Sequence, residues 1–403
     1  MECPRCHGGV PDVAHYCHHC GNDLLGQDSN RKKSYAAQPN QPVATFAPVG
    51  TIMPRGVIGH PGTYQVALVI GLLIMVVAAA LGAIPLALAV AAFAIPIVYI
   101  VYVYDVNLWE DQPVPVTLLA FVLSFALAVG WTNAWQLVKG NPDVLAAPAS
   151  QPGLDLRSLL IAVLLVPLIG EAVRQVGPLV LASRREFDDL MDGFTFGVIS
   201  GVAYSAAETL VLYWSLLRIG FAGGNIDALQ MIILLLLHGF VKPLIYGTAT
   251  GIAGAEYSGL GKGFDGFSIR WLRAAGLAVG AVALFNLGAQ LSMLVTNSGA
   301  AVILVLVWAV LLLGVLTLAA RNVLHVGLLE AALEAIARAE GTGGHDELAF
   351  CANCEMPLLP GSRFCAYCGQ SVQAHRHIPV TVGATPKTGT SAETPVGIEE
   401  GQE

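Results

Sequence analysis

The sequence predicts an all-α polytopic membrane protein with a small four-cysteine domain at each end. Three observations support this fold class. Of 403 residues, 55% are hydrophobic and only 12% are charged, which is too apolar for a soluble protein of this size. The apolar residues gather in runs of about 20, the length that crosses a hydrocarbon core of about 30 Å. All eight cysteines lie close to the two termini.

The apolar runs predict about eight transmembrane helices. Lys and Arg concentrate in alternate loops, and such an excess is typical of the cytoplasmic side of a membrane. An even number of crossings leaves both termini on one side, so we expect both in the cytoplasm. The predicted spans are 65–83, 86–104, 114–137, 156–182, 192–217, 227–251, 270–295 and 300–320.

The cysteines form two copies of one pattern, in which two Cys-x2-Cys pairs are separated by ten residues. This spacing predicts two zinc ribbons, each with four thiolates around one structural Zn²⁺. A ribbon of about 20 residues has too small a core to fold without its metal. Disulfides are the alternative, and a reducing cytoplasm disfavours them. The ligands are Cys3, Cys6, Cys17 and Cys20, then Cys351, Cys354, Cys365 and Cys368.

Composition divides the chain into six segments. The net charge is −8 and basic residues form no stripe with aromatic ones, so no nucleic-acid partner is predicted. Segments rich in Pro, Gln, Thr and Gly predict linkers, and a run with apolar residues at helical spacing predicts an amphipathic helix. The segments are an N-terminal ribbon (1–24), a flexible linker (25–62), a transmembrane domain (63–320), a cytoplasmic amphipathic helix (321–342), a C-terminal ribbon (348–372) and a disordered tail (373–403).

Three ionisable side chains, Glu171, Glu208 and His238, lie inside the predicted spans. A charged group at the centre of a bilayer costs roughly 3 kcal/mol, so such residues are functional by default. At a rise of about 1.5 Å per residue, helices four, five and six place them at similar depth, and Asn286 of helix seven falls near the same level. Two carboxylates, an imidazole and an amide in one polar cavity suit hydrolysis of a peptide bond.

Two motifs around these residues resemble a known family, the PrsW-type intramembrane proteases, which are distant relatives of the CAAX-processing glutamate proteases. Helix five holds the more specific motif, and the similarity extends over about 156–291. Helix four resembles the family motif Glu-Glu-x2-(Lys/Arg), except that a glycine replaces the first Glu. The motifs read Asp192-Gly193-x3-Gly197-x3-Gly201-x-Ala203-Tyr204-x3-Glu208 and Gly170-Glu171-x2-Arg174.

The resemblance implies an intramembrane peptidase in which Glu171 activates water or binds a metal, and Glu208 and His238 are also essential. Arg174, one turn from Glu171, would hold that carboxylate ionised. Asn286 would stabilise an oxyanion or bond between helices, and both interpretations stay open. A catalytic Zn²⁺ at Glu171, Glu208 and His238 and a bare glutamate mechanism also both stay open.

The resemblance further implies a bacterial cytoplasmic membrane as the location. The expected partners are the lipid bilayer and a membrane-protein substrate, with anti-sigma factors as one class. Gly170 leaves a second hypothesis, an inactive scaffold that recruits partners through its zinc ribbons. A third hypothesis is a transporter that uses the same carboxylates as a proton relay.

Overall fold

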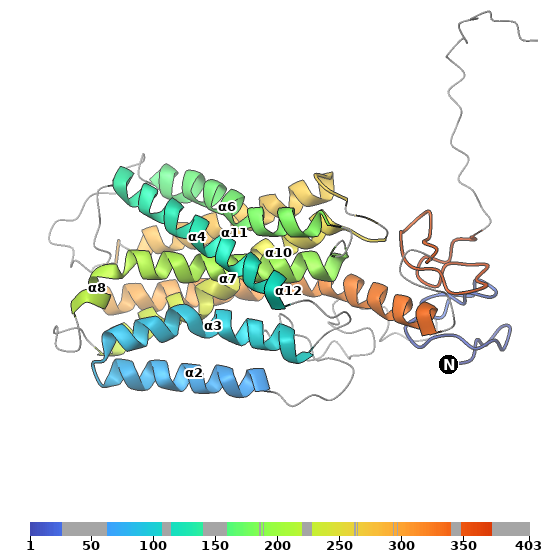
Figure 1. Ribbon diagram of the computed structural model, residues 1–403, viewed down its shortest axis with the longest axis horizontal. Helices are drawn as coiled ribbons and strands as arrows, with labels where there is room; N and C mark the ends of the chain where they lie inside the picture. The colour runs from blue at the N-terminus through green and yellow to red at the C-terminus, as the bar shows by residue number, and fades with distance from the viewer. Residues whose placement is uncertain are drawn as a thin grey trace, which may run out of the picture.

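A computed structural model of the chain confirms the predicted fold class of membrane-spanning helices with a ribbon at each terminus (Figure 1). Within the described residues there are no β-strands, only isolated bridges inside the ribbons. The linker predicted over 25–62, except Leu25, and the tail over 373–403 lie outside the described residues. The structure describes residues 1–25, 63–106, 114–139, 159–184, 187, 189–219, 228–261, 263, 265–292, 294–295, 297–339 and 348–372.

Seven stretches of the described chain are long and apolar enough to cross a membrane, and α2 is a shorter apolar helix. Both ribbons lie at the same end of the bundle (Figure 1), which requires an even number of crossings. With 18 residues α2 is about 27 Å long, close to the thickness of a hydrocarbon core, so we count it as the eighth. The helices are α2 (Thr63–Ala80), α3 (Ile84–Val106), α4 (Val114–Lys139), η2 (Ile161–Leu165), α6 (Val166–Ala182), α7 (Leu190–Leu212), α8 (Trp214–Ile219), α9 (Ala228–Leu236), η4 (Leu237–Val241), α10 (Lys242–Ser258), α11 (Ile269–Ser292) and α12 (Ser298–Ala339).

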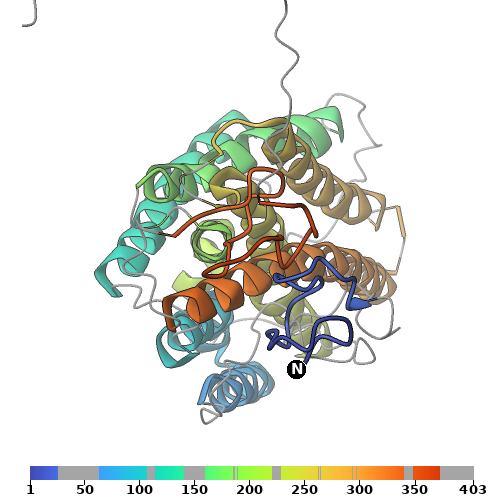
Figure 2. The same ribbon diagram turned by 90° about the vertical axis from the view of Figure 1, so that its right-hand side faces the viewer.

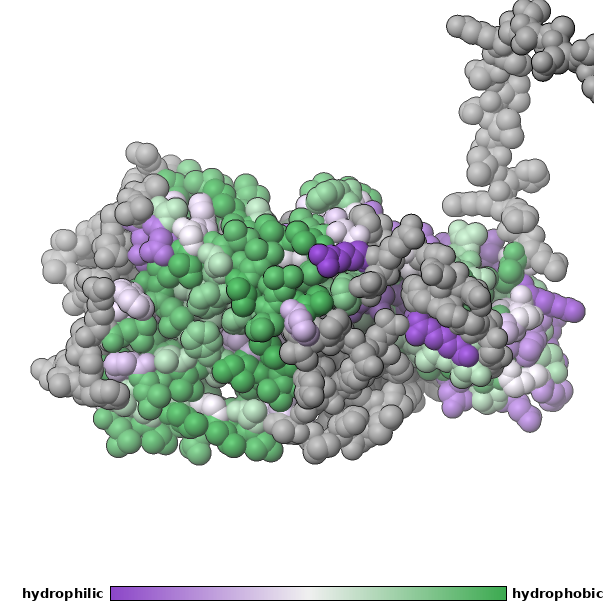
Figure 3. Space-filling view, viewed as in Figure 1, coloured by the Kyte–Doolittle hydropathy of each residue, from purple (hydrophilic) through white to green (hydrophobic). Residues whose placement is uncertain are grey.

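The surface of the bundle matches a lipid environment. Figure 3 shows mainly hydrophobic residues over the helices and most of the hydrophilic ones at the ribbon end. Large apolar side chains on α2, α4 and α12 are exposed, including Leu73, Val122 and Leu311. In water such an apolar surface would drive association, whereas in a bilayer it contacts acyl chains.

Helix α7 forms the centre of the bundle, and Figure 2 shows it enclosed by the other helices. It packs most closely on α10, through glycines of both helices. A Cβ atom on Gly197 would lie 2.6 Å from the Thr250 carbonyl oxygen, and one on Gly201 would lie 2.6 Å from the Tyr246 carbonyl oxygen. The glycines of the helix-five motif therefore serve close helix packing.

Replacing Gly197 with alanine should destabilise the bundle by about 1–3 kcal/mol, because the new methyl group meets backbone atoms that cannot move aside. Gly280→Ala in α11 is the matched control, since nothing lies within 4 Å of its Cβ position. Thermal unfolding in detergent should show a lower midpoint for Gly197→Ala only. Equal midpoints for the two variants would refute the proposed backbone contact.

Two predicted helices contain irregular turns that the apolar pattern did not indicate. A five-residue π-helical turn, η2, precedes α6, and a second one, η4, divides α9 from α10. Each is followed within two residues by a proline, Pro167 or Pro243. Proline lacks an N–H and so leaves a carbonyl of the preceding turn without its helical donor. These turns are places where backbone groups become available inside the bundle.

The last helix corrects one predicted boundary. Helix α12 runs without a break from Ser298 to Ala339, so the amphipathic helix expected over 321–342 is its continuation. Its 42 residues extend about 63 Å, twice the hydrocarbon thickness, and its end projects to the ribbons. Leu329, Leu333 and Ala337 are buried there against both ribbons. The apolar face predicted for this segment packs on protein.

Candidate functional site

The Glu171 carboxylate of α6 is buried and bonded by three neighbouring side chains. Arg174 donates to Oε2 from Nη2 at 2.7 Å and from Nε at 3.0 Å. Gln175 donates to Oε1 at 2.6 Å, and the Thr250 hydroxyl of α10 donates to Oε2 at 3.2 Å. We call these four residues the Glu171 cluster. Charge-assisted bonds of this kind are strong, so Glu171 is held in place away from open space.

The Arg174 guanidinium also lies between two tyrosine rings. Its Cζ atom is 4.8 Å from the ring centre of Tyr204 on α7 and 4.5 Å from that of Tyr246 on α10. These distances are within the range of cation–π attraction. The Ser200 hydroxyl donates to the Arg174 carbonyl oxygen. Arg174 therefore joins α6 to both helices of the central pair.

Glu208 lies near the end of α7 and pairs with a cation from α10. Its Oε2 atom is 2.7 Å from Nζ of Lys242, and its side chain keeps 14% of its surface exposed. Tyr246 also hydrogen-bonds to Glu208. Because the same tyrosine packs on Arg174, it connects Glu208 to the Glu171 cluster.

Glu208 borders a cavity of about 150 Å³ inside the bundle, which we call the Glu208 cavity. That volume admits water molecules. Asn286 also borders it, and its amide donates to the Ala162 carbonyl oxygen of η2 at 2.9 Å. The π turn thus supplies an acceptor that orients the amide. The lining residues are Trp131, Thr132, Trp135, Ala162, Val166, Tyr204, Glu208, Leu212, Asn286, Ala289 and Gln290.

His238 lies in the π turn η4 and does not line the Glu208 cavity. Its Nε2 atom is 2.9 Å from the Tyr213 hydroxyl, at the end of α7. Its Nδ1 atom is buried without a hydrogen-bond partner among the described residues. The structure therefore connects His238 to the same helix pair, one turn from Lys242, but leaves it outside the cavity.

These side chains do not form a ready metal site. Within the described parts of the chain, the only groups of three or more His, Cys, Asp and Glu ligand atoms within 4.8 Å of one another are the two cysteine clusters. Arg174 and Lys242 occupy the carboxylates of Glu171 and Glu208 instead. The Glu171, Glu208 and His238 ligand set considered for zinc is thus not assembled.

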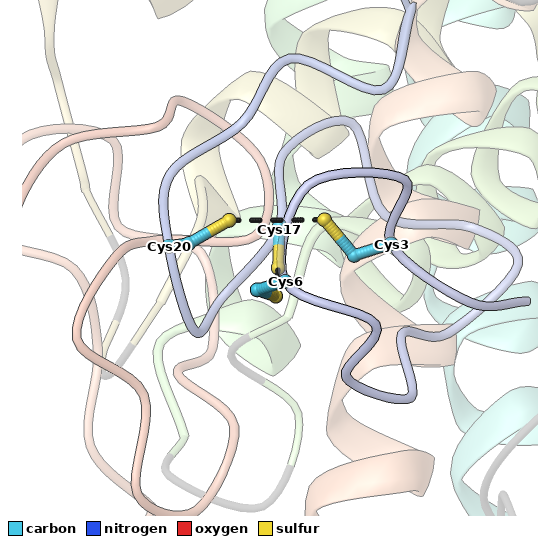
Figure 4. Close-up of side chains that lie close together, drawn as sticks. All are labelled: Cys3, Cys6, Cys17 and Cys20. Carbon is cyan, nitrogen blue, oxygen red and sulfur yellow. Dashed lines mark hydrogen bonds between the residues drawn. The ribbon is translucent and has the colours of Figure 1, made fainter.

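Both cysteine clusters fit a tetrahedral metal ion. In the first ribbon Cys3 and Cys20 have sulfurs 3.7 Å apart, and Cys6 and Cys17 have sulfurs 3.6 Å apart (Figure 4). The corresponding two pairs of the second ribbon are 3.7 Å apart. A tetrahedron with metal–sulfur bonds of about 2.3 Å has edges of about 3.8 Å. All eight cysteines are free, so the disulfide alternative does not hold.

One cysteine of each ribbon has a lowered pKa, while other ligand cysteines, Cys17 and Cys354 among them, have a raised one. Burial disfavours the Cys3 thiolate, but hydrogen bonds from the backbone N–H groups of Arg5 and Cys6 prevail and lower the pKa of Cys3 to about 6. In the second ribbon a hydrogen bond with Cys354 is the main cause that lowers the pKa of Cys365 to about 5. Each cluster can therefore present a thiolate at neutral pH.

Comparison with known proteins identifies the membrane domain. The model of the PrsW family intramembrane metalloproteases matches residues 112–315, which is half of the chain. The chain belongs to the PrsW family. The match includes every side chain of the Glu171 cluster and the Glu208 cavity, and it confirms the resemblance inferred from the two motifs. Searches of curated proteins and of solved structures found no match.

Several residues of this PrsW-family site were not predicted from the sequence. Gln175 and Thr250 complete the shell of Glu171, while Tyr246 contacts Glu208. Each is a polar or charged residue within an apolar helix, which is the signal that could have identified it. Lys242 differs from these three, because its position one turn after His238 indicates a cation that neutralises a carboxylate, and it pairs with Glu208.

Proposed function

We propose that this chain is an intramembrane endopeptidase that hydrolyses a peptide bond of a membrane protein at the Glu208 cavity. One observation supports the proposal most directly: a carboxylate, a hydroxyl and an amide border one space inside the bundle. These groups belong to Glu208, Tyr204 and Asn286. They are the kinds of group that peptide hydrolysis requires, namely a base and donors to an oxyanion.

In the proposed reaction, the Glu208 carboxylate takes a proton from water as the water oxygen attacks the peptide carbonyl carbon. The Tyr204 hydroxyl and the Asn286 amide donate to the carbonyl oxygen as it gains negative charge. Glu208 then transfers the proton to the leaving amine nitrogen, and the carbon–nitrogen bond breaks. Lys242 orients the carboxylate and compensates its charge in apolar surroundings.

The roles implied by the family resemblance are thereby redistributed. Glu171 and Arg174 act as positioning residues. The Arg174 guanidinium is paired with the Glu171 carboxylate and contacts both tyrosine rings. His238 positions Tyr213 at the end of α7, beside the cavity residue Leu212. No step of this reaction is assigned to a metal, since the three residues considered as ligands are not assembled.

The cellular setting is part of the proposal. We infer a bacterial cytoplasmic membrane with both termini in the cytoplasm, because Lys and Arg concentrate on that side and free cysteines persist in a reducing compartment. Zinc is the expected metal of both ribbons, since four thiolates in a tetrahedron are its usual structural ligands. The substrate is a membrane protein, with anti-sigma factors as the first class to examine.

The proposal can be tested by co-expressing the chain with epitope-tagged single-span bacterial membrane proteins, anti-sigma factors among them. A new fragment whose end maps within or beside the transmembrane segment is the expected result. Its formation must depend on the chain and disappear when Glu208 is replaced. If no substrate in the panel is cut by purified protein in proteoliposomes either, the proposal is contradicted.

Gly170 supports a second candidate, an inactive scaffold, because the family motif has Glu there. A Cβ atom at this position would lie 3.1 Å from the Tyr204 hydroxyl and 3.3 Å from Nη1 of Arg174. If the native chain is an active peptidase, Gly170→Glu should displace Tyr204 and reduce cleavage by about 100-fold, the effect of a shift of roughly 1 Å at a site. If it is a scaffold, cleavage should appear only in Gly170→Glu.

The measurement is fragment yield from the same tagged substrate at equal protein levels. Gly130→Ala in α4 is the control, because nothing lies within 4 Å of its Cβ position. It should leave cleavage unchanged.

A further inference from the structure

The two ribbons contact each other through an exchange of matching groups. Counterparts in the two ribbons lie 348 positions apart, as Cys3 and Cys351 do. Figure 2, which looks at the ribbon end, shows the two ribbons side by side. They come from opposite ends of the chain, yet each makes the same backbone hydrogen bonds and the same ring contact to the other.

The backbone hydrogen bonds between the ribbons follow this symmetry. The N–H groups of His15 and Tyr16 donate to the Ala366 carbonyl oxygen at 2.9 and 2.8 Å. In return, Phe364 and the residue before it donate to the His18 carbonyl oxygen at 3.1 and 2.9 Å. Ala366 is the counterpart of His18, and Phe364 is the counterpart of Tyr16. The ribbons are therefore related by a local pseudo-twofold axis.

The aromatic rings next to the ligands cross the same contact. A Cβ atom on Gly21 would lie 2.9 Å from the Phe364 ring, and one on its counterpart Gly369 would lie 2.7 Å from the Tyr16 ring. Both glycines follow the last cysteine of their ribbon and have φ values of +71°. Each metal-binding knuckle thus leaves room for the aromatic ring of the other ribbon.

The ribbon pair is also attached to the membrane domain. Val10 and Met356, one from each ribbon, are buried in one apolar cluster with Leu333 of α12. In the loop between α10 and α11, the Gly261 N–H donates to Oε1 of buried Glu330 on α12 at 2.7 Å. A Cβ atom on Gly261 would lie 3.0 Å from the carbonyl oxygen of Glu355, in the second ribbon.

We propose that the two ribbons bind zinc as one interdependent unit, and that zinc binding fixes the position of the loop between α10 and α11. Each ribbon is too small to fold without its metal, and part of its surface is completed by the other ribbon. Loss of zinc from one ribbon therefore removes hydrogen bonds and an aromatic ring from the other. The loop then loses its contact with the ribbon at Glu355, while its bond to Glu330 remains.

The test uses the full chain in detergent micelles, loaded with two equivalents of zinc. Zinc release to an excess of a chromogenic chelator is followed by absorbance. In the variant Cys3→Ser/Cys6→Ser, the second ribbon keeps all four ligands. Its zinc should leave about tenfold faster than the more quickly released zinc of the native chain, a factor equivalent to about 1.4 kcal/mol. Unchanged release from the second ribbon would overturn the interdependence.

A second variant preserves every ligand. Tyr16→Ala removes one ring that packs against the second ribbon, and should accelerate release of both zinc ions. Val372→Ala, at an exposed side chain of the second ribbon, is the control and should release zinc as the native chain does. If Tyr16→Ala affects the first zinc alone, the ribbons bind metal independently and the proposal is wrong.

The coupling to the membrane domain has a readout of its own. Amide hydrogen exchange in residues 259–261 and 265–266 should accelerate when zinc is removed from the native chain, while exchange in the middle of α7 stays slow. Unchanged exchange in the loop would overturn the coupling. None of these measurements depends on cleavage. They therefore test the interdependence of the ribbons separately from the proposed peptidase activity.

Discussion

Replacing Glu208 with glutamine should reduce substrate cleavage by about 10²–10⁴-fold, the usual contribution of a general base. The substitution keeps the shape of the side chain and removes the group that accepts the proton from water. Among the described residues that line the cavity Glu208 is the only carboxylate, so none of them can replace it as the base. The measurement is the initial rate of fragment formation in proteoliposomes, with native and variant protein at equal amounts.

Loss of activity in this variant must be separated from loss of structure, because Glu208→Gln leaves the buried Lys242 ammonium without its carboxylate. The double variant Glu208→Gln/Lys242→Met removes both charges and should recover most of the thermal stability without recovering cleavage. Glu256→Gln, a half-buried carboxylate near the other end of α10, is the control and should cleave normally. Full activity of Glu208→Gln would exclude Glu208 as the base.

The sequence predicted the membrane helices well because their signal is strong and local. A run of about 20 apolar residues has one stable solution in a bilayer, which is a helix that bonds its own backbone. The internal irregularities depend on contacts between helices. The turn η2 has a carbonyl, that of Ala162, accepting from Asn286, which is 124 residues away. The pattern of apolar residues does not predict a partner so distant in the sequence.

The continuation of α12 to Ala339 likewise depends on contacts that the sequence pattern does not predict. The sequence predicted an amphipathic helix over 321–342, because apolar residues recur there at helical spacing, and it left open whether this helix lies on the membrane or packs on the bundle. Here the apolar face meets the two ribbons, and Leu333 is fully buried among their residues. A segment with one apolar stripe suits either surface. Which of them it meets depends on domains that are distant in the sequence.

For the candidate site, the sequence identified the costly residues and one of their partners, Arg174, which pairs with Glu171, but not Gln175, Thr250 or Tyr246. Glu171, Glu208 and His238 were found because ionisable groups in apolar runs are rare. Their expected convergence rested on equal depth, which leaves the rotation of each helix undetermined. Rotation decides that Glu171 meets Thr250 of α10 whereas Glu208 faces the cavity.

Arg174→Met should be the most destabilising single change at the site. It leaves the Glu171 carboxylate, which is 2% exposed, without its cation, and breaking a buried ion pair from one side costs about 3–5 kcal/mol. The free energy of unfolding can be followed by denaturant titration in detergent micelles. Arg338→Met removes one partner of a more exposed pair on α12, with Glu334, and should cost at most about 1 kcal/mol.

The double variant Glu171→Gln/Arg174→Met distinguishes a structural pair from a positioning pair. Removing both charges ends the penalty of an uncompensated ion, so stability should return to near the native value. Cleavage should stay low, because Tyr204 and Tyr246 no longer have the guanidinium between their rings. Recovery of both stability and cleavage would mean that the pair serves the fold alone. Recovery of stability without cleavage ties Glu171 to the reaction through Arg174 and Tyr204, although Glu171 itself never meets the substrate.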